Sequence, residues 1–175
     1  VRTLAEGPAC SRAIAPVADG TYAYWVTSRT GTDAWRIERV PLAGGASSVI
    51  YTASGFNSIT ALAHDDRHLY WIEENSVDAG YVQRCAFASC GQVTETISSA
   101  PTLDMATNLA VTTDRVVFGA RRYGPPSDRI ISVPKSGGVA IDIATAPDFP
   151  RTIVTEGAAA YWIDSTSVHT VPLAG

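Results

Sequence analysis

The chain has 175 residues, of which 46% are hydrophobic, and its formal net charge at pH 7 is −4. This length fits a single domain that can bury about two thirds of its unfolded surface. No apolar run approaches the roughly 18 residues of a transmembrane helix, so we expect no membrane span. The acidic balance and the lack of a basic cluster argue against nucleic acid as a partner.

The first repeat of the chain, residues 13–53, consists of short apolar runs separated by turn residues. Asp19-Gly20 and Gly44-Gly45 supply the positive φ angles that tight hairpins need. Residues 22–26 are apolar at every position, which is typical of a strand buried on both faces. We therefore expect four strands, at 13–17, 21–27, 34–40 and 47–53.

The same pattern returns three times, in repeats at about 58–97, 107–144 and 151–171. We expect their strands at 59–63, 68–73, 81–85 and 93–97, then at 108–111, 115–120, 129–133 and 139–144, and finally at 152–154, 159–164 and 168–171. Aligning Tyr24, Tyr70, Phe118 and Tyr161 gives steps of 46, 48 and 43 residues. In this alignment Gly119 replaces a tryptophan, so we expect the third repeat to pack differently. A period near 45 residues predicts an all-β propeller of four repeats with four-stranded blades.

The fourth repeat ends before its outer strand, and the N-terminus carries a matching segment. Val1–Gly7 resembles Val49–Gly55, the outer strand of the first repeat. We therefore expect residues 1–5 to complete the last blade of one domain, 1–175, although a cut through a longer protein is the alternative. The strand could close one chain, close an eight-bladed ring of two chains, or pair with the next chain. We favour the single-chain ring, because intramolecular pairing has the higher effective concentration.

The pattern Asp65-x-x-x-x-Tyr70-Trp71, with the later Val40-Pro41-Leu42-Ala43-Gly44-Gly45 turn, resembles the Tyr-Trp-Thr-Asp repeats of low-density lipoprotein receptor-type propellers. The resemblance is closest to secreted bacterial repeat proteins of that group, of the myxobacterial kind. It covers nearly the whole chain and implies a non-enzymatic binding scaffold outside the cell or on its surface, or in the periplasm. Receptor-type propellers usually have six blades, whereas four repeats are visible here. No repeat carries the full motif: the four segments are Tyr24-Trp25-Val26-Thr27, Tyr70-Trp71-Ile72-Glu73, Phe118-Gly119-Ala120-Arg121 and Tyr161-Trp162-Ile163-Asp164.

Two of the three cysteines, Cys85 and Cys90, flank a turn where other repeats carry Val-Pro-Leu-Ala-Gly-Gly or a close variant. Two cysteines on a hairpin can reach disulfide geometry, and such a bond fits an oxidising compartment. A zinc site is the alternative, but zinc needs about four ligands, and only Cys10 and scattered histidines remain. We favour a disulfide between Cys85 and Cys90. Cys10 is then either a free thiol or a link to something outside this chain.

Motifs for catalysis, metal binding and cofactor binding are absent from the sequence, so we expect no metal and no cofactor. His64 precedes Asp65 in a turn, where a capping role is favoured over ligation. His169 is expected to be an ordinary strand residue. Glu73 and Glu74 are adjacent on a strand and point to opposite faces, so we expect solvated or ion-paired carboxylates rather than a catalytic pair.

The repeat separates two edges, which we call the constant-turn rim and the variable-loop rim. The constant-turn rim holds the turns after the first and third strands. The variable-loop rim holds five connections of differing sequence, at 28–33, 74–80, 98–106, 122–128 and 145–150. Variable loops on a rigid frame usually carry binding. A protein or glycan ligand would meet guanidinium groups and aromatic rings here, and the candidate binding residues are Arg29, Trp35, Arg121, Arg122 and Tyr123.

Three functions remain open at this point. The first is a binding scaffold for a protein or glycan through the variable-loop rim, which we favour over an enzyme. The second is a structural subunit that self-associates through its N-terminal strand. The third is a lyase or hydrolase that uses a rim carboxylate as its base. For the candidate binding residues, the alternative is a solvated loop stiffened by Pro125 and Pro126.

Overall fold

The computed structural model of the chain describes residues 1–4, 10–29, 34–75, 79–101, 105–121 and 128–173. Within these ranges the secondary structure consists of fifteen strands and no helix. All strand pairs are antiparallel, and each sheet is a meander in which consecutive strands are neighbours. The all-β fold predicted from the repeat is therefore confirmed.

The strands form four sheets, three of four strands and one of three. The first sheet contains β1 (Cys10–Ala18), β2 (Tyr22–Arg29), β3 (Trp35–Pro41) and β4 (Ser48–Thr52). The second contains β5 (Ser58–His64), β6 (His68–Glu74), β7 (Ala79–Ala86) and β8 (Glu95–Pro101). The third contains β9 (Met105–Val111), β10 (Arg115–Arg121), β11 (Asp128–Pro134) and β12 (Ile141–Thr145). The fourth contains β13 (Thr152–Glu156), β14 (Ala159–Ile163) and β15 (Val168–Pro172).

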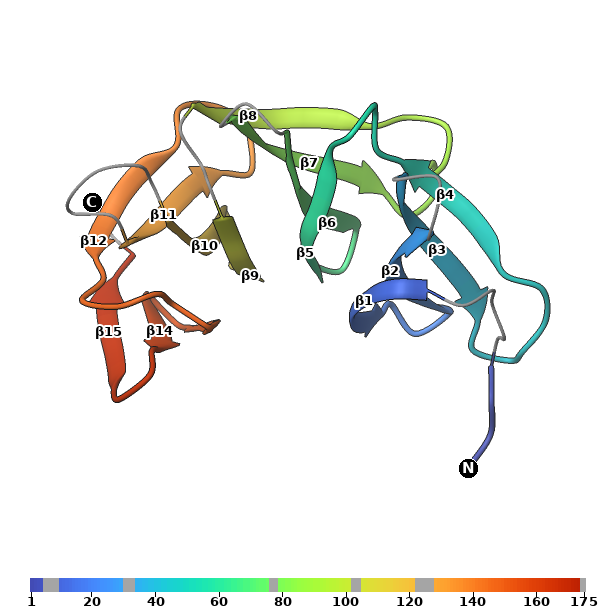
Figure 1. Cartoon of the computed structure of the whole chain (residues 1–175), viewed down its shortest axis with the longest axis horizontal. Helices are drawn as coiled ribbons and strands as arrows, with labels where there is room; N and C mark the ends of the chain where they lie inside the picture. Colours follow the sequence, from blue (N-terminus) through green and yellow to red (C-terminus); the bar gives the residue numbers. More distant parts are fainter. Residues whose placement is uncertain (5–9, 30–33, 76–78, 102–104, 122–127, 174–175) are drawn as a thin grey trace.

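The four sheets stand side by side as the blades of an open arc (Figure 1). The first strands β1, β5 and β9 lie on the concave side, and the outer strands β4, β8 and β12 lie on the convex side. Each sheet packs face to face against the next, so the chain builds one interface between each pair of neighbours. This is the blade arrangement of a β-propeller.

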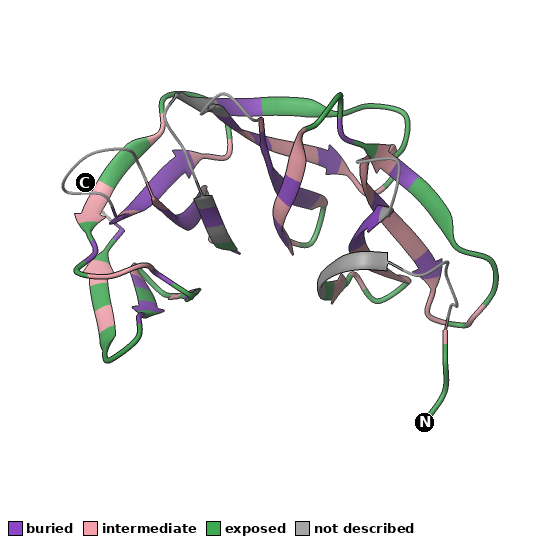
Figure 2. Cartoon of the chain, in the orientation of Figure 1, coloured by how far each residue is buried: buried purple, intermediate pink, exposed green. Residues whose placement is uncertain are grey.

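An apolar cluster fills each of the three interfaces between neighbouring sheets. Trp71 is the largest buried side chain between the first and second sheets, Phe118 lies between the second and third, and Trp162 lies between the third and fourth. Buried residues concentrate on the middle strands, and exposed residues follow the outer strands and β15 (Figure 2). The central strands are buried on both faces, as their continuous apolar runs predict.

In the first and second sheets, one aspartate side chain holds the turn between the first and second strands of the sheet. Asp65 Oδ1 accepts hydrogen bonds from the backbone amides of Arg67 and His68, both at 2.8 Å, and Oδ2 accepts one from the Tyr70 hydroxyl at 2.9 Å. Asp19 makes the same three bonds in the first sheet, with Tyr24 donating to Oδ2 at 2.7 Å. Asp and Asn favour such turns because their side chains satisfy the amides two and three residues ahead.

The third sheet corrects our alignment by one residue. Its turn is held by Thr112, whose Oγ1 accepts from the amides of Asp114 and Arg115. Thr112 therefore matches Asp65, so that Val117 matches Tyr70 and Phe118 matches Trp71. The successive steps are then 46, 47 and 44 residues. Phe118, and not Gly119, replaces the tryptophan.

A backbone bond that occurs in all four sheets supports this alignment. In each sheet the turn after the third strand donates an amide to a carbonyl in the turn after the first strand, at 2.8 or 2.9 Å. The donors are Leu42, Phe87, Lys135 and Leu173, and their acceptors are Thr21, Arg67, Asp114 and Ala158 respectively. The acceptor Asp114 thus matches Arg67, which places Thr112 at the position of Asp65.

The fourth sheet has three strands, and the strand expected from residues 1–5 is not part of it. Residues 1–4 lie at the other end of the arc (Figure 1), and the Arg2 guanidinium donates to the Ala43 carbonyl of the first sheet. The single-chain ring that we favoured is therefore not formed. Within the described residues the four sheets form an open arc and not a closed ring (Figure 1).

Cys85 and Cys90 form the expected disulfide, with their Cα atoms 5.1 Å apart. Both are buried, at 4% and 7% exposure, in the cluster between the first and second sheets. The bond closes the turn that follows β7. Nearby, Phe87 packs against Tyr24 of the first sheet, with ring centroids 5.6 Å apart.

Candidate functional site

The variable-loop rim is described from the strand ends and connections that border its loops. Residues 30–33, 76–78, 102–104 and 122–127 lie outside the described part of the chain, and these include the predicted site residues Arg122 and Tyr123. The backbone of Arg29 ends β2 and pairs with Cys10. The described rim residues come from all four sheets, and contacts of Glu73, Glu74 and Arg121 reach neighbouring segments at this edge.

Trp35, a predicted binding residue, begins β3 and is partly buried against the apolar cluster between the first and second sheets. Its carbonyl accepts a hydrogen bond from the Ala53 amide at 2.9 Å. This position anchors the end of the loop that joins β2 to β3. Trp35 as a whole is partly exposed.

Arg121, a second predicted binding residue, is held in place by its own sheet and by the following connection. Its Nε lies 2.9 Å from Asp128 Oδ1, so the pair closes the base of the β10–β11 loop. The guanidinium carbon stands 4.8 Å from the centroid of the Phe149 ring. Asp128 is buried, whereas the Arg121 side chain is 39% exposed. The guanidinium is therefore oriented before any ligand binds.

Glu73 and Glu74 join the second sheet to both of its neighbours. Glu73 accepts hydrogen bonds from the Tyr51 hydroxyl and from Asn57 Nδ2, the latter at 2.7 Å, on the side of the first sheet. Glu74 accepts a hydrogen bond from the Ala106 amide on the side of the third sheet. The two carboxylates point to opposite faces as predicted, but they are buried, at 2% and 8% exposure, rather than solvated.

These bonds change the acidity of the tyrosine. Burial and then the Glu73 carboxylate raise the pKa of Tyr51 well above its ordinary value, so the phenol stays protonated as a donor. Tyr51 and Asn57 are thus the donors, and the Glu73 carboxylate is the acceptor that they share. Sequence reasoning missed it because Tyr51 and Asn57 lie 22 and 16 residues from Glu73.

The fourth sheet places an aspartate–histidine pair at the same rim. Asp164 Oδ2 lies 2.7 Å from Nε2 of His169, whose ring stacks on Trp162 at 5.1 Å between centroids. The Thr166 amide, and then His169, hold the pKa of Asp164 at about 2. Sequence reasoning took His169 for an ordinary strand residue, but its spacing of five from Asp164 repeats that of Tyr70 from Asp65.

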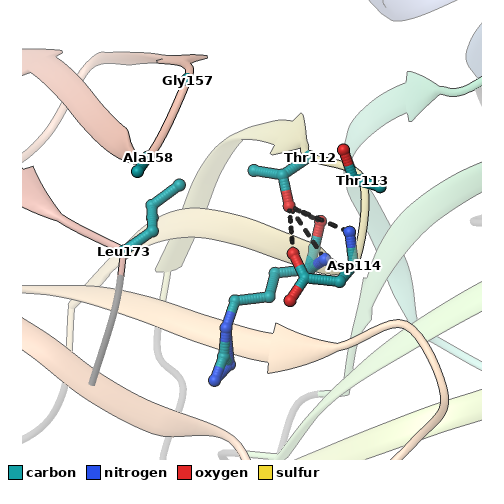
Figure 3. A pocket seen from close by; sticks show the side chains of 7 residues that line it. Thr112, Thr113, Asp114, Gly157, Ala158 and Leu173 are labelled. Atoms are coloured by element: carbon teal, nitrogen blue, oxygen red, sulfur yellow. Dashed lines mark hydrogen bonds between the residues drawn. The ribbon is translucent and has the colours of Figure 1, made fainter.

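The constant-turn rim carries two cavities at equivalent junctions between sheets. One, of about 340 Å³, lies between the second and third sheets and is lined by Asp65, Tyr70, Arg84 and Lys135, among others. The other, of about 350 Å³, lies between the third and fourth sheets (Figure 3). Figure 3 shows Thr112 bonded to its turn on one side of this cavity and Leu173 facing it from the other.

Lys135, the only lysine of the chain, is one of the charged side chains that line the first of these cavities. Its Nζ lies 2.6 Å from Asp65 Oδ2 and 5.6 Å from the centroid of the Tyr70 ring. Burial alone would raise the pKa of Asp65, but the Lys135 ammonium and the backbone amides of the turn hold it well below its ordinary value. The lysine is thus engaged in the junction between sheets.

The predicted turn role of His64 is confirmed, since its Nδ1 lies 2.9 Å from the Asp65 carbonyl oxygen. Among the described residues, no group of three or more His, Cys, Asp or Glu side chains is placed to hold a metal ion. No helix in the described ranges is long and apolar enough to span a membrane.

No protein-family model and no curated protein sequence matches the chain. Solved structures do match. A chain of the nidogen/laminin complex is 17% identical with a TM-score of 0.68, over 89% of this chain and 56% of that one. TolB from Acinetobacter baumannii is 14% identical with a TM-score of 0.65, over 93% and 41% of the two chains.

A puromycin hydrolase variant in complex with PGG is 14% identical with a TM-score of 0.67, over 97% of this chain and 28% of that one. The chain therefore spans between 28% and 56% of the length of these three matched structures. At these identities the likeness concerns the fold, and it agrees with the propeller built from the sheets above.

Proposed function

We propose that this domain is a non-enzymatic binding or scaffold module that recognises a protein or a glycan through the variable-loop rim. The observation that carries the proposal is the rigid base of that rim. Glu73, Glu74 and Arg121 are each fixed by hydrogen bonds or ring contacts to other segments. Loops of differing sequence on such a frame are suited to recognition.

The side chains expected at this rim suit an acidic or carbohydrate ligand. Trp35 and Arg121 are partly exposed, and the sequence adds Arg29, Arg122 and Tyr123 to the same edge. Guanidinium groups bind carboxylates in a bidentate manner, and aromatic rings stack on sugars or apolar side chains. The nidogen/laminin match comes from a structure of a protein complex, which supports a protein ligand as the first one to test.

The disulfide supports an extracellular or periplasmic location, because such bonds persist in oxidising compartments. We place the domain among propellers with Tyr-Trp-Thr-Asp-type repeats of secreted bacterial proteins. Its Asp-x-x-x-x-Tyr-Trp segments supply the support for this placement. In two sheets the aspartate bonds both its turn and the tyrosine of that segment.

The test is a binding screen with the purified chain against a glycan array and a phage-displayed peptide library. A selected glycan or peptide is then titrated against variants of the rim. Arg121→Ala, Trp35→Ala and Tyr123→Ala should each weaken binding about tenfold or more, since central aromatic and arginine contacts contribute more than about 1.4 kcal/mol to binding.

The matched control is Arg67→Ala, on the constant-turn rim, whose side chain is 81% exposed. It should leave the affinity unchanged. Circular dichroism of each variant separates loss of binding from loss of fold. Unchanged binding in all three rim variants, with a correct fold, would place the site elsewhere.

The alternative is an enzyme, either a lyase or a hydrolase. One of the matched structures is a puromycin hydrolase, which is the reason to test this alternative. A rim base would be Glu73 or Asp164, but each accepts several hydrogen bonds from fixed donors. The geometry therefore gives more support to a binding frame. The second alternative, a structural subunit that assembles between chains, rests on a different part of the molecule.

A further inference from the structure

The two ends of the arc expose opposite halves of one interface. Within the chain, the face that carries Trp71, Phe118 or Trp162 packs against the preceding sheet. The opposite face, which carries Tyr24 or Tyr70, packs against the following sheet. The first sheet begins the arc and the fourth sheet ends it (Figure 1). One end therefore presents a tryptophan face and the other presents a tyrosine face.

The tyrosine face of the fourth sheet carries four exposed apolar side chains, beside Thr152, Glu156 and Thr170 on the same face. Val154 is paired with Tyr161, and Ile163 is paired with Val168, so all four side chains share one face of the sheet. Their exposures are 56%, 38%, 42% and 74% in the order Val154, Tyr161, Ile163, Val168. By contrast, Tyr24 and Tyr70 occupy the position of Tyr161 in earlier sheets and are 1% exposed. A contiguous apolar patch of this kind marks an interaction surface.

The tryptophan face of the first sheet carries the matching row. Trp25 is paired with Glu38, which is paired in turn with Val49, so the three side chains cross one face of the sheet. Trp25 is partly exposed and Val49 is 48% exposed, whereas Val40 on the same face is 2% exposed, so this face is open along the row from Trp25 to Val49 and not throughout. The equivalent row in the fourth sheet, Trp162 and His169, packs against the third sheet.

We propose that a second copy of this chain docks the tryptophan face of its first sheet on the tyrosine face of the fourth sheet. The chain already forms this type of interface three times within itself, which identifies the complementary surface as its own repeat. The contact joins two different faces, so it is heterologous, and it closes when the second copy returns the same contact. Two arcs of four sheets make a ring of eight, within the range of about four to eight blades that propellers adopt.

This inference is independent of the proposed binding function, because the two faces do not include the rim residues Trp35 and Arg121. Closure would leave the variable-loop rims of both copies on the open edges of the ring. A failure of one proposal therefore leaves the other standing.

The experiment measures the mass of the purified chain by size-exclusion chromatography with light scattering, over a hundredfold range of concentration. The expected mass of the wild type at high concentration is twice the chain mass of 18.5 kDa. Val168→Asp introduces a charge on the tyrosine face, and Val49→Asp introduces one on the tryptophan face. Each variant should run at the mass of a single chain.

Mixing the two variants tests whether the contact is heterologous. Each variant retains one intact face, so an equimolar mixture should form a dimer joined by a single interface. The control is Val139→Asp, because Val139 is 79% exposed in the β11–β12 turn and lies on neither face. This variant should keep the wild-type mass.

Several results would overturn the proposal. If the wild type stays at the single-chain mass, the two faces do not bind a second copy, and further repeats of a longer protein would be their partners. A mass that grows without limit would show an open polymer. A dimer that survives Val49→Asp would show that two tyrosine faces pair with each other. Circular dichroism confirms that every variant is folded.

Discussion

A single position in the turn after the third strand sets the character of each junction between sheets. Phe87, Lys135 and Leu173 occupy this position in successive sheets, as their shared backbone bond shows. Phe87 packs on Tyr24, and Lys135 pairs with Asp65 above Tyr70. Leu173 instead faces Thr112 across a cavity. The side chain at this one position thus makes the junction aromatic (Phe87), ionic (Lys135) or open (Leu173), while the strand order of the sheets stays the same.

The ionic junction predicts an acid-sensitive contribution of Lys135 to stability. Lys135→Met keeps the apolar stem and removes the charge, which should lower the free energy of unfolding at pH 7 by about 1–2 kcal/mol. Because the pKa of Asp65 is lowered in the folded chain, the contribution is fully present above about pH 5 and is lost as the pH falls through 4 and below.

Urea unfolding of both proteins at pH 7, 4 and about 2 measures this effect. The difference in the free energy of unfolding between wild type and variant should persist at pH 4 and narrow at about pH 2, as the pH approaches the lowered pKa of Asp65. Arg67→Met, at a neighbouring but exposed position, should stay within about 0.5 kcal/mol of wild type at every pH. An equal difference at pH 7 and at about pH 2 would show that the acidity of the Asp65 carboxylate does not depend on the lysine.

At the scale of the element, the sequence located the strands because turn residues recur at a nearly fixed spacing. The third sheet shows the limit of this signal. Its central strand is apolar at every position from Val116 to Ala120, so the sequence does not reveal which side chain faces which neighbour. The turn residue there is Thr112, whose hydroxyl replaces a carboxylate. The alignment therefore shifted by one, and Phe118 was taken for the tyrosine of the repeat.

The candidate site was only partly accessible to such reasoning. The connections that border the rim could be ranked by their variability. The buried contacts of Glu73 could not, because Tyr51 and Asn57 come from other segments and no local pattern marks their approach. Arg121 was predicted from the sequence as a binding residue, but its contact with Phe149, on a later connection, was not. Contacts between sheets depend on how the sheets pack, which the repeat period does not encode.

The hairpin disulfide supports a prediction at this same scale. Cys85 and Cys90 are five residues apart, so by chain entropy the bond adds about 2 kcal/mol at most. Reduction should therefore leave the far-ultraviolet circular dichroism unchanged and lower the unfolding midpoint only slightly. Cys85→Ser/Cys90→Ser should behave like the reduced protein.

Mass spectrometry checks the pairing itself. The intact chain should be two hydrogens lighter than the reduced chain, and native alkylation should modify Cys10 alone. Reaction of two or more thiols without reductant would contradict the bond. Complete unfolding on reduction would show that the turn contributes more to the fold than its small loop implies.

At the scale of the molecule, the described residues form an open arc that leaves strand edges as well as sheet faces exposed. β15 is the outermost strand of the fourth sheet within the described residues, and its free side carries backbone donors and acceptors. Unpaired edges of this kind readily recruit another strand. Residues 1–4 project from the other end of the arc (Figure 1), where a ring of two copies would bring them beside β15 of the partner.

The final prediction is that residues 1–6 strengthen the two-chain ring by adding the missing strand. Val1 matches Val49, which pairs with Glu38, and Glu38 matches His169 of β15. Val1 of one copy should therefore lie opposite His169 of the other. Deleting residues 1–6 should raise the dissociation constant of the dimer about tenfold or more, because several backbone bonds are lost at once. Amide exchange along β15 should slow with dimer formation in the full chain and remain fast in the truncated one. A dimer of unchanged affinity after the deletion would mean that the faces alone hold the ring and that the N-terminal residues remain beside their own first sheet.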